Sequence, residues 1–161
     1  MKTTISIWFL DIVIILIAGC TDPYVGLNYQ RYVMGKINND LIYCYRFGWG
    51  VDGMVYYISK KKDPCLGFSV EQDVCLGKGE SIIYFQVTHD TLNLYTNTKA
   101  TKPKIFPGII KMMYYDNESY HLFEDSWNKH RLSKVVFDTA TFVSPCNLIY
   151  DLSTKVMRRV D

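Results

Sequence analysis

The chain lacks the close pairs of cysteine and histidine that hold zinc. Its 161 residues include five cysteines and three histidines, with no C-x₂-C pair and no histidines in register, which excludes the common zinc-site spacings. It also lacks a G-x-S-x-G elbow and a complete phosphate-binding loop, and no pair of carboxylates stands out as general acid and base. We therefore predict no catalytic residue, no metal ion and no cofactor.

The net charge of the chain is also small. Lysine and arginine total 18 residues against 16 aspartates and glutamates, which leaves a net charge of +2. Domains that bind nucleic acid usually carry a strong basic excess. The even balance therefore argues against nucleic acid as the main partner.

One long apolar run is present, and it lies at the N-terminus. Residues 5–17 are apolar except for Ser6 and Asp11, and Lys2 precedes them. The run is shorter than the ~20 residues that a membrane-spanning helix needs, and its length and preceding lysine suit a secretory signal. Its end, Ile17-Ala18-Gly19-Cys20, resembles the lipobox of bacterial lipoprotein precursors. The alternatives are an uncleaved anchor helix and a buried helix of a cytosolic domain.

The lipobox resemblance implies a division of the chain and a location for it. Residues 1–19 are expected to be a cleaved signal peptide, 20–30 a lipidated tether that carries its lipid on Cys20, and 31–161 a single β-rich domain. Thr21 stands where an aspartate tends to retain lipoproteins in the inner membrane. The resemblance therefore favours the outer membrane, with the protein facing the periplasm.

Four cysteines remain after the lipidated one, and an even number in an exported domain predicts two disulfides. They are Cys44, Cys65, Cys75 and Cys146. Four cysteines allow three pairings. Proximity in the sequence favours Cys65–Cys75, which leaves Cys44–Cys146 as the second bridge.

Turn residues separate short runs of β-branched and aromatic residues along most of the chain, and this pattern predicts strands. Hairpins are expected to join 31–37 to 41–47 around Asn38-Asn39-Asp40, 81–87 to 91–97 around His89-Asp90, and 109–115 to 119–124 around Asp116-Asn117-Glu118. Further strands are expected over 54–59, 147–150 and 155–160. Residues 125–137 fit either a short helix or a strand over 131–137, and we favour the strand. We predict a mainly β fold, a small antiparallel sandwich or a partly closed barrel.

Aromatic residues supply the candidate binding surface. The chain has 13 tyrosines, and some are adjacent, so that in a strand one ring of each pair faces the core and the other faces away. A tryptophan also lies in a glycine-rich loop over 48–53. We predict that the partner is contacted by Trp49, Tyr56, Tyr57, Tyr114 and Tyr115. Packing of these rings across neighbouring strands is the alternative.

Two segments carry a further resemblance. Leu41-Ile42-Tyr43-Cys44-Tyr45 and Gly53-Met54-Val55-Tyr56-Tyr57 resemble immunity lipoproteins that act against type VI secretion effectors, notably periplasmic lipase toxins. The resemblance implies a β-rich inhibitor that binds a toxin and blocks its active site. We therefore expect a lipid-anchored periplasmic binding protein without catalytic activity, most concretely an immunity protein. An accessory subunit of an envelope complex and an envelope enzyme or small-ligand carrier are the alternatives.

Overall fold

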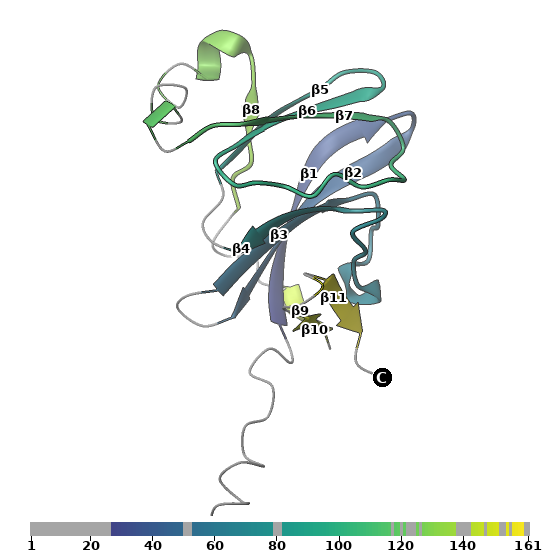
Figure 1. The fold of residues 1–161 in the computed structure, drawn as a ribbon. Helices are drawn as coiled ribbons and strands as arrows, with labels where there is room; N and C mark the ends of the chain where they lie inside the picture. Colours follow the sequence, from purple (N-terminus) through teal and green to yellow (C-terminus); the bar gives the residue numbers. More distant parts are fainter. Residues whose placement is uncertain are drawn as a thin grey trace, which may run out of the picture.

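Two β-sheets lie face to face in the computed structural model of this chain (Figure 1). The structure describes residues 27–49, 53–78, 82–116, 118–119, 121, 125, 127–137, 143–146, 148–151, 154 and 156–159. The first sheet has the order β4-β3-β2-β1-β9, the second has the order β7-β6-β5-β8, and β10 and β11 form a separate pair. The strands are β1 (Leu27–Ile37), β2 (Asp40–Trp49), β3 (Gly53–Ser59), β4 (Val74–Lys78), β5 (Ile83–Val87), β6 (Thr91–Thr96), β7 (Ile109–Tyr114), β8 (Ser133–Lys134), β9 (Val143–Cys146), β10 (Leu148–Asp151) and β11 (Val156–Arg159). The predicted mainly β sandwich is confirmed.

The β1–β2 hairpin follows from its turn residues. Asn38 and Asn39 both have positive φ, 48° and 72°, and they connect Ile37 directly to its partner Asp40. A two-residue turn with both φ values positive matches the twist of the flanking strands, and asparagine tolerates this conformation. The predicted hairpins β1–β2 and β5–β6 are both confirmed.

The folded domain begins earlier than the sequence suggested. β1 starts at Leu27, so residues 27–30 belong to the first sheet rather than to a tether. Tyr29 and Gln30 are buried and pair with Phe47 and Arg46 on β2. The predicted start of the domain at residue 31 is therefore four residues too late.

The main core fills the space between the two sheets. Along β6, Leu92 and Leu94 are fully buried while Asn93 and Tyr95 are half-buried, as the two-residue period of a strand predicts. The other large buried side chains of this core are Met34, Ile37, Ile42, Tyr56, Ile58, Val74, Leu76, Ile83, Phe85, Ile110 and Val135. The alternation fixes which face of each sheet meets the other.

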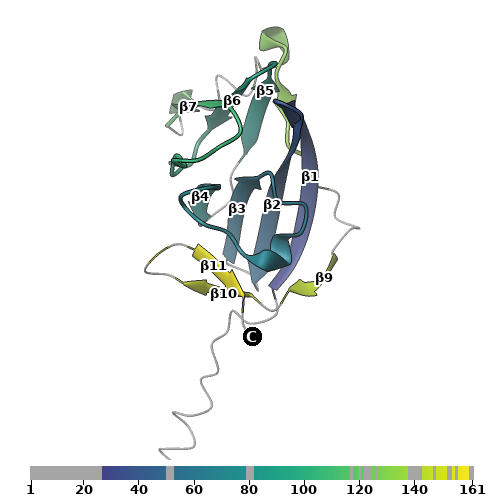
Figure 2. The ribbon, with the colours of Figure 1, turned by 90° about the vertical axis from the view of Figure 1, so that its right-hand side faces the viewer.

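The opposite face of the first sheet is covered as well. The short helix η1 (Pro64–Leu66) and the residues after it lie over this face (Figure 2), and Phe68 stacks on Tyr57 with ring centroids 4.4 Å apart. Consequently Tyr56 and Tyr57 are both buried, at 3% and 1% exposure. Their prediction as partner-contact residues is wrong, because a central strand covered on both faces leaves neither ring at the surface.

The second sheet contains a parallel pair that the sequence did not predict. β7 runs parallel to β6, and Ser119 and His121 are helical rather than part of a strand, so the third predicted hairpin is wrong. The chain reaches β7 by a crossover over residues 97–108. Gly108, at the end of this crossover, lies against Asp90, the residue before β6. A Cβ added at Gly108 would lie 2.2 Å from the Asp90 carbonyl oxygen, so only glycine fits at this position.

Residues 125–137 combine the two predicted alternatives. Trp127–His130 form a short 3-10 helix, η2, and Ser133–Lys134 form β8, which pairs with β5. The favoured strand over 131–137 is therefore mostly irregular. Trp127 stacks on Tyr84 with ring centroids 5.2 Å apart, and this contact covers part of the outer face of the second sheet.

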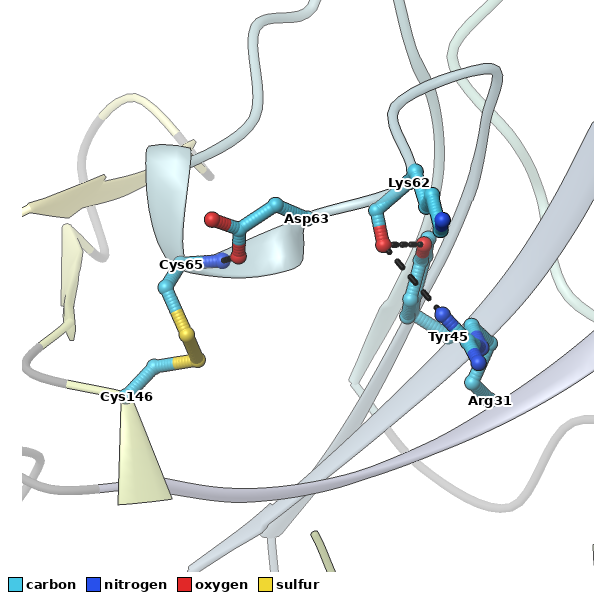
Figure 3. Close-up of a disulfide and its surroundings, with 6 residues drawn as sticks. All are labelled: Arg31, Tyr45, Lys62, Asp63, Cys65 and Cys146. Atoms are coloured by element: carbon cyan, nitrogen blue, oxygen red, sulfur yellow. Dashed lines mark hydrogen bonds between the residues drawn. A yellow bond between two sulfur atoms is a disulfide. The ribbon is translucent and has the colours of Figure 1, made fainter. Parts of the chain in front are cut away.

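The disulfide joins Cys65 in η1 to Cys146 in β9 (Figure 3). The predicted pairings Cys65–Cys75 and Cys44–Cys146 are wrong, and Cys44 and Cys75 are buried thiols. Cys75 lies on β4, and β4 and β9 are opposite edges of the first sheet. The short sequence separation of Cys65 and Cys75 did not predict the pairing, because the disulfide joins η1 to β9, at the edge of the sheet opposite β4.

Candidate functional site

The strands at the edges of the two larger sheets differ in how accessible they are. The crossover lies against β4, where Thr101 donates its amide proton to the Cys75 carbonyl at 2.8 Å. β9 contains Pro145, which has no N–H to offer, and β8 spans two residues. A covering segment, a proline in the strand and a short strand each protect a sheet edge from pairing with another chain. β7 spans six residues, and in the described part of the chain no strand pairs with its outer side.

β7 lies at the outer side of the second sheet, next to β6 (Figure 2), and its backbone has hydrogen-bonding groups along this open edge. The amides of Ile109 and Tyr115 donate to the Asp90 and Thr96 carbonyls of the β6 side at 2.7 and 3.1 Å. Because inward and outward groups alternate along a strand, the amides of the even-numbered residues face outward. These residues are Ile110, Met112 and Tyr114. β7 therefore has the donors and acceptors that a further strand would need.

Apolar side chains accompany these backbone groups. Ile109, Met113 and Tyr114 are 51%, 39% and 53% exposed, while Ile110 is buried in the core between the sheets. An exposed edge with apolar side chains is a template for pairing with another chain. Tyr114 was predicted as a contact residue, and the structure places it on this edge.

The other residues predicted to contact a partner do not lie on this edge or lie outside the described residues. Tyr115 is half-buried and stacks on Tyr95 with ring centroids 6.5 Å apart. Trp49 ends β2, but its side chain lies outside the described residues, as does the whole of Cys20. Sequence reasoning missed Ile109 and Met113 because nothing local marks a strand as an edge.

A hollow of about 350 Å³ lies on the side of the crossover nearest η1. It is lined by Lys60, Lys61, Gln72, Asp73, Ile105, Phe106 and Pro107. Lys61 Nζ lies 3.0 Å from Asp73 Oδ2 and also donates to the Gly67 carbonyl at 2.9 Å. The same carboxylate oxygen accepts from the Ser69 amide at 2.8 Å. Asp73 is 1% exposed, so these bonds hold the segment after β3 against the sheet and give the pair a structural role.

The buried phenols beside this segment are also structural. Tyr45 donates its hydroxyl proton to the Lys61 carbonyl at 2.6 Å, and Arg31 reaches the neighbouring Lys62 carbonyl at 3.4 Å (Figure 3). Burial raises the pKa of Tyr45 and Tyr57, and it raises the pKa of Tyr150 to about 12. These phenols remain neutral at neutral pH, so they do not provide an acid–base pair.

The Cys44 thiol lies in the core of the domain. Burial raises the pKa of the Cys44 thiol, which leaves it unreactive. In the described ranges, no three metal-ligating side chains come together. Within the described residues, the open β7 edge with its exposed apolar side chains is the candidate binding feature.

This chain was compared with protein families, curated proteins and solved structures. No protein-family model, no curated protein and no solved structure matches this chain.

Proposed function

We propose that this chain is a lipid-anchored protein of the bacterial envelope that binds a partner protein by adding one of the partner's strands to β7. The observation that carries the proposal is the open β7 edge, with three outward amides and exposed Ile109, Met113 and Tyr114. Strand addition draws affinity from backbone hydrogen bonds and specificity from alternate side chains. Such a function needs no catalytic group.

The disulfide supports the envelope location. Disulfides persist in oxidising compartments such as the periplasm and are rare in the cytosol. The Cys65–Cys146 bridge therefore agrees with the lipobox-like segment that ends at Cys20. Among the described residues, no helix has the length and apolar character to cross a membrane.

The most concrete form of this function is toxin immunity. An immunity protein inhibits by covering the active site of a secreted effector, and a partner strand held on β7 would place the effector against this edge. An accessory subunit of an envelope complex would use the same edge for a different partner. A pull-down from native envelopes, read by mass spectrometry, distinguishes the two by the partner recovered.

Replacing Met112 with proline tests the binding mode. Met112→Pro removes an outward amide of β7 and leaves the amides that bond to β6, so the sheet should persist. The loss of an interchain hydrogen bond of ~1.5 kcal/mol weakens binding about tenfold. The measurement is the affinity for the recovered partner, with Met112→Leu as the control that keeps the amide and the side-chain volume. Equal affinities for Met112→Pro and Met112→Leu would contradict strand addition at this edge.

Replacing Cys20 tests the anchor. Two or three acyl chains hold a protein on a membrane effectively permanently, whereas one chain binds only marginally. We expect Cys20→Ala to abolish fatty-acid labelling and to leave an uncleaved precursor or a soluble protein. Membrane fractionation with labelled fatty acid checks this, with Cys44→Ala as the control. Labelling that survives Cys20→Ala would contradict the lipid anchor.

A further inference from the structure

Positive charge is concentrated beside the open edge. Residues 97–115 contain four lysines and no aspartate or glutamate, although the whole chain has a net charge of only +2. The four are Lys99, Lys102, Lys104 and Lys111. The crossover and β7 therefore form a basic surface, defined here as these four lysines together with the β7 edge.

The lysines are placed where a segment paired with β7 would meet them. Lys102 and Lys104 line a hollow of about 230 Å³ together with Phe106 and with Ile109 and Ile110, the first residues of β7. The Lys104 side chain is 81% exposed, and its ammonium lies 3.7 Å from the carboxylate of Glu71, which is 61% exposed. Such an exposed pair stabilises little and leaves the ammonium open to a stronger partner.

A lysine also lies near the far end of β7, where the exposed Asp116 follows the strand. Lys99 Nζ lies 5.8 Å from the centre of the Tyr114 ring, so a cation stands beside the last residue of the strand. Lys111 lies between these two ends, exposed, and shares its face of the strand with Ile109 and Met113. A segment paired along β7 would thus meet apolar side chains and positive charge in alternation.

Lys111 also disfavours a second copy of this chain as the occupant. In an antiparallel pair of two β7 strands centred on residue 111, Lys111 would lie directly opposite Lys111 of the other copy. Centring on residue 112 would place the two lysines diagonally beside each other. Like charges at these positions destabilise strand pairing, and an edge lysine is a common protection against self-association.

We propose that the basic surface selects an extended acidic segment of the partner and excludes a second copy of this chain. This inference rests on the proposed strand addition and specifies the chemistry of what is added. Acidic side chains of the segment lie opposite Lys111 and beside Lys102 and Lys104, and its apolar side chains lie against Ile109 and Met113. Complementary charge raises the association rate and rejects wrong partners.

Two synthetic peptides test the selection directly. One alternates valine with glutamate and the other alternates valine with lysine. Fluorescence anisotropy is measured with dye-labelled peptide and the full-length protein in detergent. We expect the valine–glutamate peptide to bind at least ~10-fold more tightly, and Lys111→Glu to reduce that preference about tenfold. Lys129→Glu is the matched control, since Lys129 is exposed in η2, before β8 on the opposite edge of the same sheet.

The outcomes separate the acid selection from the strand addition. Equal binding of the two peptides, no binding of either, or equal effects of Lys111→Glu and Lys129→Glu would overturn the selection. If Met112→Pro weakens the native partner while the peptides bind equally, strand addition stands and the acid preference is wrong. If the valine–glutamate peptide keeps its full affinity for Met112→Pro, the basic surface binds acids without strand pairing and the proposed function fails instead.

Removing the central lysine tests the exclusion of a second copy. We expect Lys111→Val to form a dimer at concentrations where the unmodified protein and Lys129→Val have the mass of one chain, because valine favours strand pairing and carries no charge. Native mass spectrometry gives the mass. The same mass for Lys111→Val and Lys129→Val would overturn the exclusion.

Discussion

Breaking the Cys65–Cys146 disulfide is expected to lower the free energy of unfolding by about 4–5 kcal/mol. The bridge spans a sequence separation of 81 residues, and loop entropy in the unfolded chain gives a contribution of this size. It also ties η1 to β9, at the edge of the first sheet. Urea unfolding of the Cys65→Ser/Cys146→Ser protein, with and without reductant, measures the effect.

The buried thiols provide the matched control for the disulfide. Cys44→Ala and Cys75→Ala each remove a sulfur from the core without removing a cross-link, so each should cost about 1–2 kcal/mol. Reductant should lower the stability of these two variants as much as that of the unmodified protein. A stability that does not respond to reductant, or mass mapping that joins Cys65 to Cys75, would contradict the structure.

Replacing Lys61 with methionine is expected to destabilise the domain by about 3 kcal/mol. Lys61→Met keeps most of the aliphatic chain but leaves the Asp73 carboxylate, which is 1% exposed, with the hydrogen bond from the Ser69 amide and without its cation. Removing one partner of a buried ion pair leaves an uncompensated charge, which costs several kcal/mol. Chemical denaturation measures the loss.

The neighbouring lysine is the control for this ion pair. Lys60 lies 3.7 Å from Asp40, and both side chains are about half exposed, so Lys60→Met should cost less than ~1 kcal/mol. The double variant Lys61→Met/Asp73→Asn should recover part of the loss, because the uncompensated charge is gone. Equal effects of Lys61→Met and Lys60→Met would show that the buried pair does not stabilise the domain.

Features of the fold that depend on neighbouring residues were predictable from the sequence. Asn38 and Asn39 specify their turn by backbone preference alone, and the alternation of Leu92 and Leu94 with polar neighbours specifies which face of β6 is buried. Both features follow from the local sequence, because the turn and the strand period are local properties.

Features that depend on distant packing were not predictable. The parallel pairing of β7 with β6 is set by a crossover that bonds to β4 through Thr101. The burial of Tyr57 is set by Phe68, and the pairing of Cys65 is set by the position of η1 beside β9. The candidate site shares this property, because only the arrangement of the strands shows that β7 is an edge.

Hydrogen exchange along β7 tests strand addition most directly. The outward amide of Met112 should exchange quickly in the free protein and slow by ~10-fold or more in the complex with the partner recovered from envelopes, because it gains a backbone acceptor. The inward amide of Ile109, which already bonds to the Asp90 carbonyl, should change little. Unchanged exchange at Ile110, Met112 and Tyr114 on partner binding would contradict the proposed function.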